Sequence, residues 1–358
     1  MRPAQTGHEG DVLRLRRRLH LGEPGGAVVA TKTTIWLCPG QGAQKVGMAK
    51  DLAERFPAAR QALEAIDGKL GFALSHLMFD GPENELTETQ NAQPAILAHS
   101  AAVFAALGSA IDGGGGGRGG AVAAAGHSLG EYTAYITAGA LGATEAAALV
   151  RRRGELMQQA GTERPGTMAA VLGLATAEVE AACRTASTGG AVVVAANINA
   201  PDQTVISGDP AAVAKAGEAC KARGAKRVVP LKVSGAFHSS LMAPAANHLR
   251  LALERAPFRD PTFPVIANAT AEPVRDAGRA RRLLADQLTS PVRWVACMQR
   301  AAALADEAHG EATAPREVQF IEIGPGNVLA GLLRRIVPGA NVISLGTADE
   351  VARFLEAA

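Results

Sequence analysis

The chain has 358 residues, of which 47% are hydrophobic and 20% are charged, and its formal net charge is only +2 at pH 7. This composition is typical of a soluble globular protein with space for one large domain and a smaller one. Because no clustered basic face is obvious, we expect no nucleic-acid partner. The longest uncharged run, residues 90–111, contains Asn91, Gln93, His99 and Ser100, so it predicts a buried helix and no membrane span.

The first 32 residues differ in composition from the others. Residues 13–26 (LRLRRRLHLGEPGG) are basic and then rich in Gly and Pro. This composition indicates either that residues 1–32 form a disordered N-terminal extension or that the start codon was assigned too early. An organellar transit peptide is the alternative, although Glu9, Asp11 and Glu23 depart from its usual acid-poor composition. We therefore expect a cytoplasmic protein, with organellar import as the alternative.

The cysteines suggest a reducing compartment. There are four of them, and they are scattered: Cys38, Cys183, Cys220 and Cys297. Because no C-x-x-C pair is present, we expect isolated buried thiols and neither a disulfide framework nor a metal site.

Strands and helices alternate after residue 32. The pattern predicts, in order, a strand running into a Gly-rich turn (33–44), helices at about 45–66 and 91–109, a Gly-rich loop (112–120), a strand (121–126), and helices near 130–139 and 144–160. Such alternation predicts an α/β fold with a mostly parallel sheet covered on both faces.

Residues 166–230 follow a different order. A strand, a helix, two strands, a helix and a strand are predicted there, which is the β-α-β-β-α-β order of a ferredoxin-like unit. We therefore predict a small ferredoxin-like subdomain over 166–230, inserted into a large hydrolase-like α/β domain made of 33–165 plus 231–358. The elements predicted after the insertion are helix 241–254, strand 262–267, helices near 280–289 and 293–305, strand 318–323, helix 326–335 and a final strand–helix pair.

The stretch GHSLG, residues 126–130, has the G-x-S-x-G pattern of a nucleophile elbow. It follows a predicted strand and opens a predicted helix, as the elbow requires, and Ser128 is the candidate nucleophile. An isolated match to this pattern is also common in plain turns.

A nucleophilic serine needs a base, and His238 is the candidate because it follows the predicted strand end in LKVSGAFHSSLMAP (231–244). A structural histidine remains the alternative. Between Ser128 and His238 the only aspartates are Asp202 and Asp209, both in the predicted insertion. We therefore expect a carbonyl or amide, rather than a carboxylate, to orient the imidazole.

Several motifs together resemble the malonyl-CoA:acyl-carrier-protein transacylases, the acyltransferases of fatty-acid and polyketide synthesis. They occur in this order: PGQGAQKVGM (39–48), TQNAQPAIL (89–97), GHSLGEYTA (126–134), RRRGELMQ (151–158), ANINAPDQTVISG (196–208), GAFHSSLM (235–242), SPVRW (290–294) and EIGPGNVLAGL (322–332). The resemblance covers roughly residues 33–347.

The resemblance implies a Ser128–His238 dyad whose imidazole is held by a main-chain carbonyl, which we assign to Arg293 of PVRW, where many fatty-acid members have Gln. It also implies an oxyanion hole formed by the N–H groups of Gln41 and Leu129. No metal and no bound cofactor are expected.

The resemblance further implies the residues that contact substrate. Arg153 matches a carboxylate-binding arginine, and a guanidinium is suited to bind the free carboxylate of a malonyl group. Phe237 resembles the malonyl-selective form of its motif. We expect Gln93 to line the pocket, Asn199 to hold the facing loop or contact the thioester, and His127 to support the elbow.

The implied reaction moves malonyl from malonyl-CoA, through a malonyl-serine, to the phosphopantetheine thiol of an acyl carrier protein. We expect a monomer whose basic patch, near 221–232 or 279–282, receives the acidic carrier. A serine esterase or thioesterase and a non-catalytic scaffold are the two alternatives.

Overall fold

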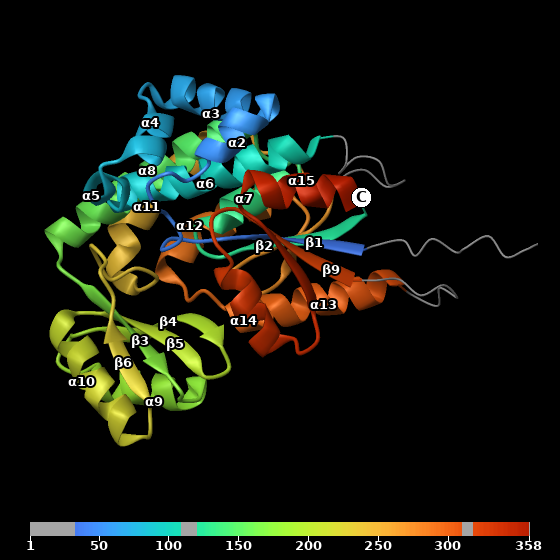
Figure 1. Ribbon diagram of the computed structural model, residues 1–358. Coiled ribbons are helices and arrows are strands. Elements are labelled where there is room, and N and C mark those ends of the chain that lie inside the picture. The colour runs from blue at the N-terminus through green and yellow to red at the C-terminus, as the bar shows by residue number, and fades with distance from the viewer. Residues whose placement is uncertain (1–32, 109–119, 310–317, 358) are drawn as a thin grey trace, which may run out of the picture.

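A computed structural model of the chain describes residues 33–108, 120–309 and 318–357 (Figure 1). The predicted N-terminal extension and almost all of the Gly-rich loop lie outside the described residues. The fold contains two sheets, and Figure 1 shows the smaller one, with helices α9 (Thr176–Ala186) and α10 (Pro210–Ala222), on the far side of the molecule from the C-terminus.

The larger sheet has six strands in the order β10-β9-β1-β2-β7-β8. Their bounds are β1 (Thr33–Cys38), β2 (Ala121–Gly126), β7 (Val265–Ile266), β8 (Pro273–Val274), β9 (Val318–Ile323) and β10 (Asn341–Leu345). All pairings are parallel except that of β7 with β8. The prediction of a mostly parallel α/β sheet is therefore confirmed.

Helices cover both faces of this sheet. Because both faces of β1 are therefore buried, its sequence is almost continuously apolar. Successive side chains of a strand point to opposite faces. Ile35 and Leu37 pack in the cluster that contains Trp294 of α13 (Trp294–His309), whereas Trp36 and Cys38 pack in the cluster on the other face. All six residues of β1 are buried.

The helices outside the smaller-sheet unit are α2 (Lys50–Arg55), α3 (Pro57–Leu70), α4 (Leu74–Asp80), α5 (Glu83–Leu86), α6 (Thr89–Leu107), α7 (Gly130–Thr137), α8 (Ala143–Glu163), α11 (Ala243–Arg255), α12 (Ala277–Asp286), α13 (Trp294–His309), α14 (Val328–Ile336) and α15 (Ala348–Ala357). Two 3₁₀ turns, Ser240–Met242 and Gln287–Thr289, complete the set.

The single helix predicted at 45–66 is wrong, because the chain forms α2 and α3 there. Pro57 begins α3, and the preceding Phe56 is extended, with φ −116° and ψ 109°. A residue before proline is pushed out of the helical region, and proline fits the first turn of a helix. Helices α4 and α5 and the short strand β8 were not predicted.

The smaller sheet has the strand order β4-β5-β3-β6, with every pairing antiparallel. Its elements are β3 (Thr167–Leu172), α9 (Thr176–Ala186), β4 (Val193–Ala200), β5 (Gln203–Gly208), α10 (Pro210–Ala222) and β6 (Arg227–Pro230). The predicted ferredoxin-like order is confirmed. The division into two domains at 165/166 and 230/231 stays a prediction.

The two sheets meet through β4, which packs against α13 and α14. Asn197 in β4 also forms an isolated parallel bridge with Val292, just before α13. Among the described residues, no helix has both the length and the apolar composition needed to cross a membrane.

Candidate active site

Ser128 lies in the turn between the end of β2 and the start of α7. Its φ is +53°, which is the left-handed region that side-chain-bearing residues rarely adopt and that often accompanies function. The main-chain N–H of Ser128 donates to Asn268 Oδ1 at 2.7 Å, which helps to hold the strained conformation. The local geometry is that of a nucleophile elbow.

Close backbone packing explains why the elbow has glycine on both sides. A Cβ atom on Gly126 would lie 1.9 Å from the carbonyl carbon of Gly130, and one on Gly130 would lie 2.2 Å from the carbonyl oxygen of Cys38. The N–H of His127 also donates to that Cys38 oxygen, at 2.9 Å. The elbow is thus fixed against the end of β1, where the 39–44 turn begins.

The structure brings His238 to Ser128. The distance from Ser128 Oγ to His238 Nε2 is 2.8 Å, and His238 Nδ1 lies 3.0 Å from the main-chain carbonyl oxygen of Gln287. A carbonyl can only accept, so Nδ1 carries the proton and Nε2 is free to act as a base. Burial, and after it the positive charge of Arg153, lowers the pKa of His238 to about 3, so the imidazole is neutral at pH 7.

The assignment of the orienting carbonyl to Arg293 is wrong. The Arg293 carbonyl accepts instead from the N–H of Cys297 at 2.9 Å, because Arg293 directly precedes α13 and its carbonyl takes part in the first helical turn. Its side chain is exposed and donates from Nε to the carbonyl of Ala269 at 3.0 Å. Gln287, in the 3₁₀ turn six residues earlier, provides the carbonyl for His238.

Arg153 is the third residue at this point, and it is only 1% exposed. Its Nη2 donates to Ser128 Oγ at 3.0 Å and to Gln287 Oε1 at 3.0 Å, and its Nη1 donates to Gln93 Oε1 at 2.6 Å. Because a guanidinium only donates, the Ser128 hydroxyl proton is left to point at His238 Nε2. The contact from Arg153 thus leaves the hydroxyl proton directed at the imidazole.

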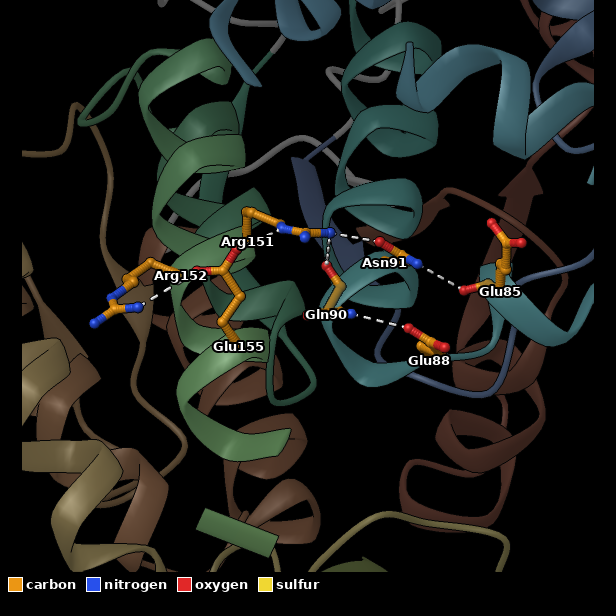
Figure 2. A network of polar contacts seen from close by, with 7 residues as sticks. All are labelled: Glu85, Glu88, Gln90, Asn91, Arg151, Arg152 and Glu155. Atoms are coloured by element: carbon orange, nitrogen blue, oxygen red, sulfur yellow. Dashed lines mark hydrogen bonds and ion pairs between the residues drawn. The ribbon is translucent and has the colours of Figure 1, made fainter. Parts of the chain in front are cut away.

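The two preceding arginines on α8, Arg151 and Arg152, contact other partners (Figure 2). Arg151 donates to Asn91 Oδ1 at 2.5 Å and to the carbonyl of Gln90 at 3.2 Å, and it pairs with Glu155. Arg152 is exposed and pairs with the same Glu155 at 3.4 Å. Gln90, Asn91 and Arg151 line an open surface hollow of about 660 Å³, and neither Ser128 nor His238 lines it. Arg153 alone of the three reaches the serine.

A cavity of about 420 Å³ opens onto Ser128 and His238, which is within the usual size range of small-molecule sites. Its walls come from the smaller sheet, from α8 and from loops that include the elbow: Gln41, Gly42, Gln44, Thr87, His127, Ser128, Met157, Met168, Asn197, Asn199, Val205, Leu231, Lys232, Val233, Phe237 and His238. A ligand bound there would lie between the two sheets.

The remaining predicted substrate-contact residues lie near Ser128, but Gln93 does not lie on the cavity wall where it was expected. Phe237, His127 and Asn199 line the cavity, and His127 Nε2 contacts Asn199 Oδ1 at 2.8 Å. Gln93 was expected on the cavity wall, but it is fully buried and reaches the site through Arg153. This contact thus joins the elbow, through His127, to β4 of the smaller sheet, through Asn199.

The two predicted oxyanion donors come from the loops that meet at the elbow. Gln41 follows β1 and lines the cavity. Leu129 is the N-cap residue of α7, so its N–H belongs to the set that a helix leaves without an internal partner. A helix start directed at a reacting carbonyl is suited to stabilise negative charge.

The sequence did not reveal three buried polar residues beside the serine: Glu131, Asn268 and Gln287. One signal was available for Asn268, which is the first polar residue after the strand that pairs with β2. Polar groups at the carboxyl ends of neighbouring parallel strands gather at one edge of the sheet. Nothing comparable marked Gln287 or Glu131. Within the described ranges, no three His, Cys, Asp or Glu side chains are grouped to hold a metal ion.

A strained serine, a neutral imidazole and a buried guanidinium on a parallel sheet are the arrangement of an α/β protein built for acyl transfer. The chain belongs to the acyl transferase domain family, whose model matches residues 35–345, and among curated proteins it resembles those named malonyl CoA-acyl carrier protein transacylase. The family resemblance inferred from the motifs is therefore confirmed.

Two of these relatives are bacterial enzymes of similar length. The protein from Bacillus subtilis is 41% identical over 301 residues, which is 84% of this chain and 89% of the relative. The one from Escherichia coli is 39% identical over 318 residues, or 89% of this chain and 97% of the relative.

Solved structures of two similar proteins also match this chain over nearly its whole length. An acyl carrier protein S-malonyltransferase from Vibrio cholerae has a TM-score of 0.82 and 37% identity, with 90% of this chain and 100% of that one covered. A malonyl-transacylase solved in complex with a type II polyketide acyl-carrier protein has a TM-score of 0.81 and 38% identity, covering 91% and 100%.

Proposed function

We propose that this protein transfers a malonyl group from malonyl-CoA to the phosphopantetheine thiol of an acyl carrier protein, through a malonyl ester on Ser128. The observation that carries the proposal is the position of Arg153. Its guanidinium is buried, contacts the nucleophile, and is held by two neutral amides, while its Nε has no partner among the described residues. A buried cation without a contacting carboxylate is suited to receive one from the substrate.

In the first half-reaction, Ser128 Oγ attacks the thioester carbonyl while its proton moves to His238 Nε2. The N–H groups of Gln41 and Leu129 stabilise the oxyanion of the tetrahedral intermediate. Collapse of that intermediate breaks the C–S bond, and the proton on Nε2 passes to the departing CoA sulfur. The Gln287 carbonyl, which accepts from His238 Nδ1, stabilises the transient imidazolium.

The second half-reaction repeats these steps in reverse with a new thiol. His238 Nε2 takes the proton of the phosphopantetheine thiol, the sulfur attacks the malonyl ester, and Ser128 leaves with the proton. Arg153 binds the malonyl carboxylate throughout, which discriminates against acetyl because that group would leave the guanidinium without its partner. No metal or bound cofactor takes part in either step.

The carrier must reach the cavity with its arm, and we propose that basic residues at the rim receive it. Of the segments expected to dock the acidic carrier, 221–232 includes Lys232, which is exposed and lines the cavity. We expect the protein to act as a monomer, with fatty-acid or polyketide synthesis as the pathway served.

The test is the fate of malonyl when both acceptors are present. With malonyl-CoA and saturating holo carrier protein, we expect most of the released CoA to be matched by malonyl-carrier, and Ser128→Ala to abolish both. If free malonate forms as fast as malonyl-carrier, the protein is an esterase or thioesterase. If Ser128→Ala leaves function intact, the protein is a scaffold.

A further inference from the structure

Glu131 is a buried acid that the mechanism above does not use. It lies in the first turn of α7, three residues after Ser128, and is 0% exposed. Its Oε2 accepts from Gln287 Nε2 at 2.7 Å and from the N–H of Asn268 at 2.9 Å. Burial raises the pKa of this carboxyl to about 7, and the two hydrogen bonds and the charge of Arg153 oppose the rise. Burying a carboxyl group is energetically costly, so a fully buried acid three residues from the nucleophile suggests a function for its side chain.

The side chain of Gln287 links Glu131 to Arg153. Its Nε2 donates both to Glu131 Oε2 and to the carbonyl oxygen of Ser128, the latter at 3.0 Å. Its Oε1 accepts from Arg153 Nη2 at 3.0 Å. The two ends of one amide therefore connect the acid on α7 with the arginine on α8.

A side-chain amide can adopt two orientations that exchange its oxygen and nitrogen. In the reversed orientation, Gln287 Oε1 would face Glu131 Oε2 and the Ser128 carbonyl, so that three oxygens would meet without a proton between them. Its NH₂ would then face the guanidinium of Arg153, so that donors would meet donors. Glu131 Oε2 already accepts from the N–H of Asn268, and the Ser128 carbonyl oxygen can only accept, so both require a donor from Gln287 and together exclude this orientation.

We propose that Glu131 is a positioning residue for malonyl recognition: it fixes the orientation of the Gln287 amide, and that amide holds Arg153 in place to receive the malonyl carboxylate. This inference rests on the proposed function of Arg153. The selectivity for malonyl thus depends on a residue that touches neither Arg153 nor the substrate.

Two variants separate positioning from charge. Glu131→Gln can place its oxygen where Oε2 lies and keep both hydrogen bonds, whereas Glu131→Met has a similar size and no oxygen acceptor. The measurement is the ratio of kcat/KM for malonyl-CoA to kcat/KM for acetyl-CoA, from the rate of Ser128 acylation followed by intact mass. The control is Glu155→Met, on the surface of α8, which we expect to leave the ratio unchanged.

We expect Glu131→Met to lower the malonyl-to-acetyl ratio by about 10- to 100-fold, the usual effect of one lost hydrogen bond to a charged group. Glu131→Gln should stay within about threefold of the wild type. Gln287→Met, which keeps the main-chain carbonyl for His238, should lower the ratio as much as Glu131→Met, and the double variant should show little further loss because both act through one contact.

An unchanged ratio in a folded Glu131→Met, an equal loss in Glu131→Gln, or additive losses in the double variant would each overturn the inference. If Glu131→Met does not fold, Gln287→Met decides alone, and an unchanged ratio in it is again contrary. Arg153→Ala is measured in parallel. If Arg153→Ala keeps the wild-type ratio, the proposed function of Arg153 itself fails; if only the Glu131 and Gln287 variants keep it, the positioning inference fails.

Discussion

Arg153→Ala is the substitution whose effect the site geometry defines best. The guanidinium has five N–H donors in a planar fork, and a malonyl carboxylate can accept two of them side by side. Each hydrogen bond to a charged group is worth about 1.5–3 kcal/mol. Two of them give about 3–6 kcal/mol, so kcat/KM for malonyl-CoA should fall by roughly 10²- to 10⁴-fold.

The same substitution also removes the contact from Nη2 to Ser128 Oγ, which would affect any acyl donor. Acetyl-CoA, which lacks the carboxylate, measures that general effect, and the ratio of the two kcat/KM values isolates the carboxylate contact. Both are measured as initial rates of Ser128 acylation. The matched control is Arg151→Ala, which removes a partly exposed arginine two residues earlier that is paired with Glu155 and should change neither rate by more than about twofold.

Equal losses with malonyl-CoA and acetyl-CoA would refute the reasoning, because they would show that Arg153 serves the nucleophile alone. Thermal unfolding of each variant excludes a trivial loss of structure. Removal of Arg153 leaves Gln93 Oε1 and Gln287 Oε1 without the donor they now have, so some destabilisation is expected at about 1–3 kcal/mol per group.

Two further predictions concern pH and specificity. His99 is buried in α6, and burial lowers its pKa to about 4. As pH falls below about 6.5, the unfolded chain therefore takes up a proton at this histidine that the folded protein does not. Between about pH 7 and pH 5 the free energy of unfolding of the wild type, measured by urea titration, should fall by about 1–2 kcal/mol more than that of His99→Leu. Parallel slopes for the two proteins would contradict this. Phe237 lines the cavity and is 5% exposed; Phe237→Ala should raise the use of methylmalonyl-CoA relative to malonyl-CoA about tenfold, and an unchanged ratio of the two acylation rates would show that the ring does not crowd the α-methyl group.

Ser128, His238 and Arg153 could be selected from the sequence because each lies in a short local pattern. The elbow is a strand–turn–helix unit within residues 121–137, and the patterns around His238 and Arg153 resemble those of one family. The ferredoxin-like unit was predictable for a similar reason, since its four strands and two helices follow one another in the chain without interruption.

The partner of His238 could not be obtained in this way, because it depends on how one turn packs against a distant loop. Arg293 and Gln287 lie six residues apart, and the sequence does not show that a helix begins immediately after Arg293 and uses its carbonyl. Glu131 and Asn268 present the same difficulty. Glu131 accepts from Asn268 and Gln287, which lie 137 and 156 residues further along the chain, and no spacing rule connects them.

The covalent intermediate is the central claim, and one measurement tests it most directly. The protein is mixed with malonyl-CoA in the absence of any carrier protein, and its intact mass is followed before and after holo carrier protein is added. We predict a mass increase of one malonyl group, located on Ser128 by peptide mapping, that disappears as the carrier gains the same group. Transfer to the carrier without any acylated protein, or malonyl on a residue other than Ser128, would contradict the mechanism.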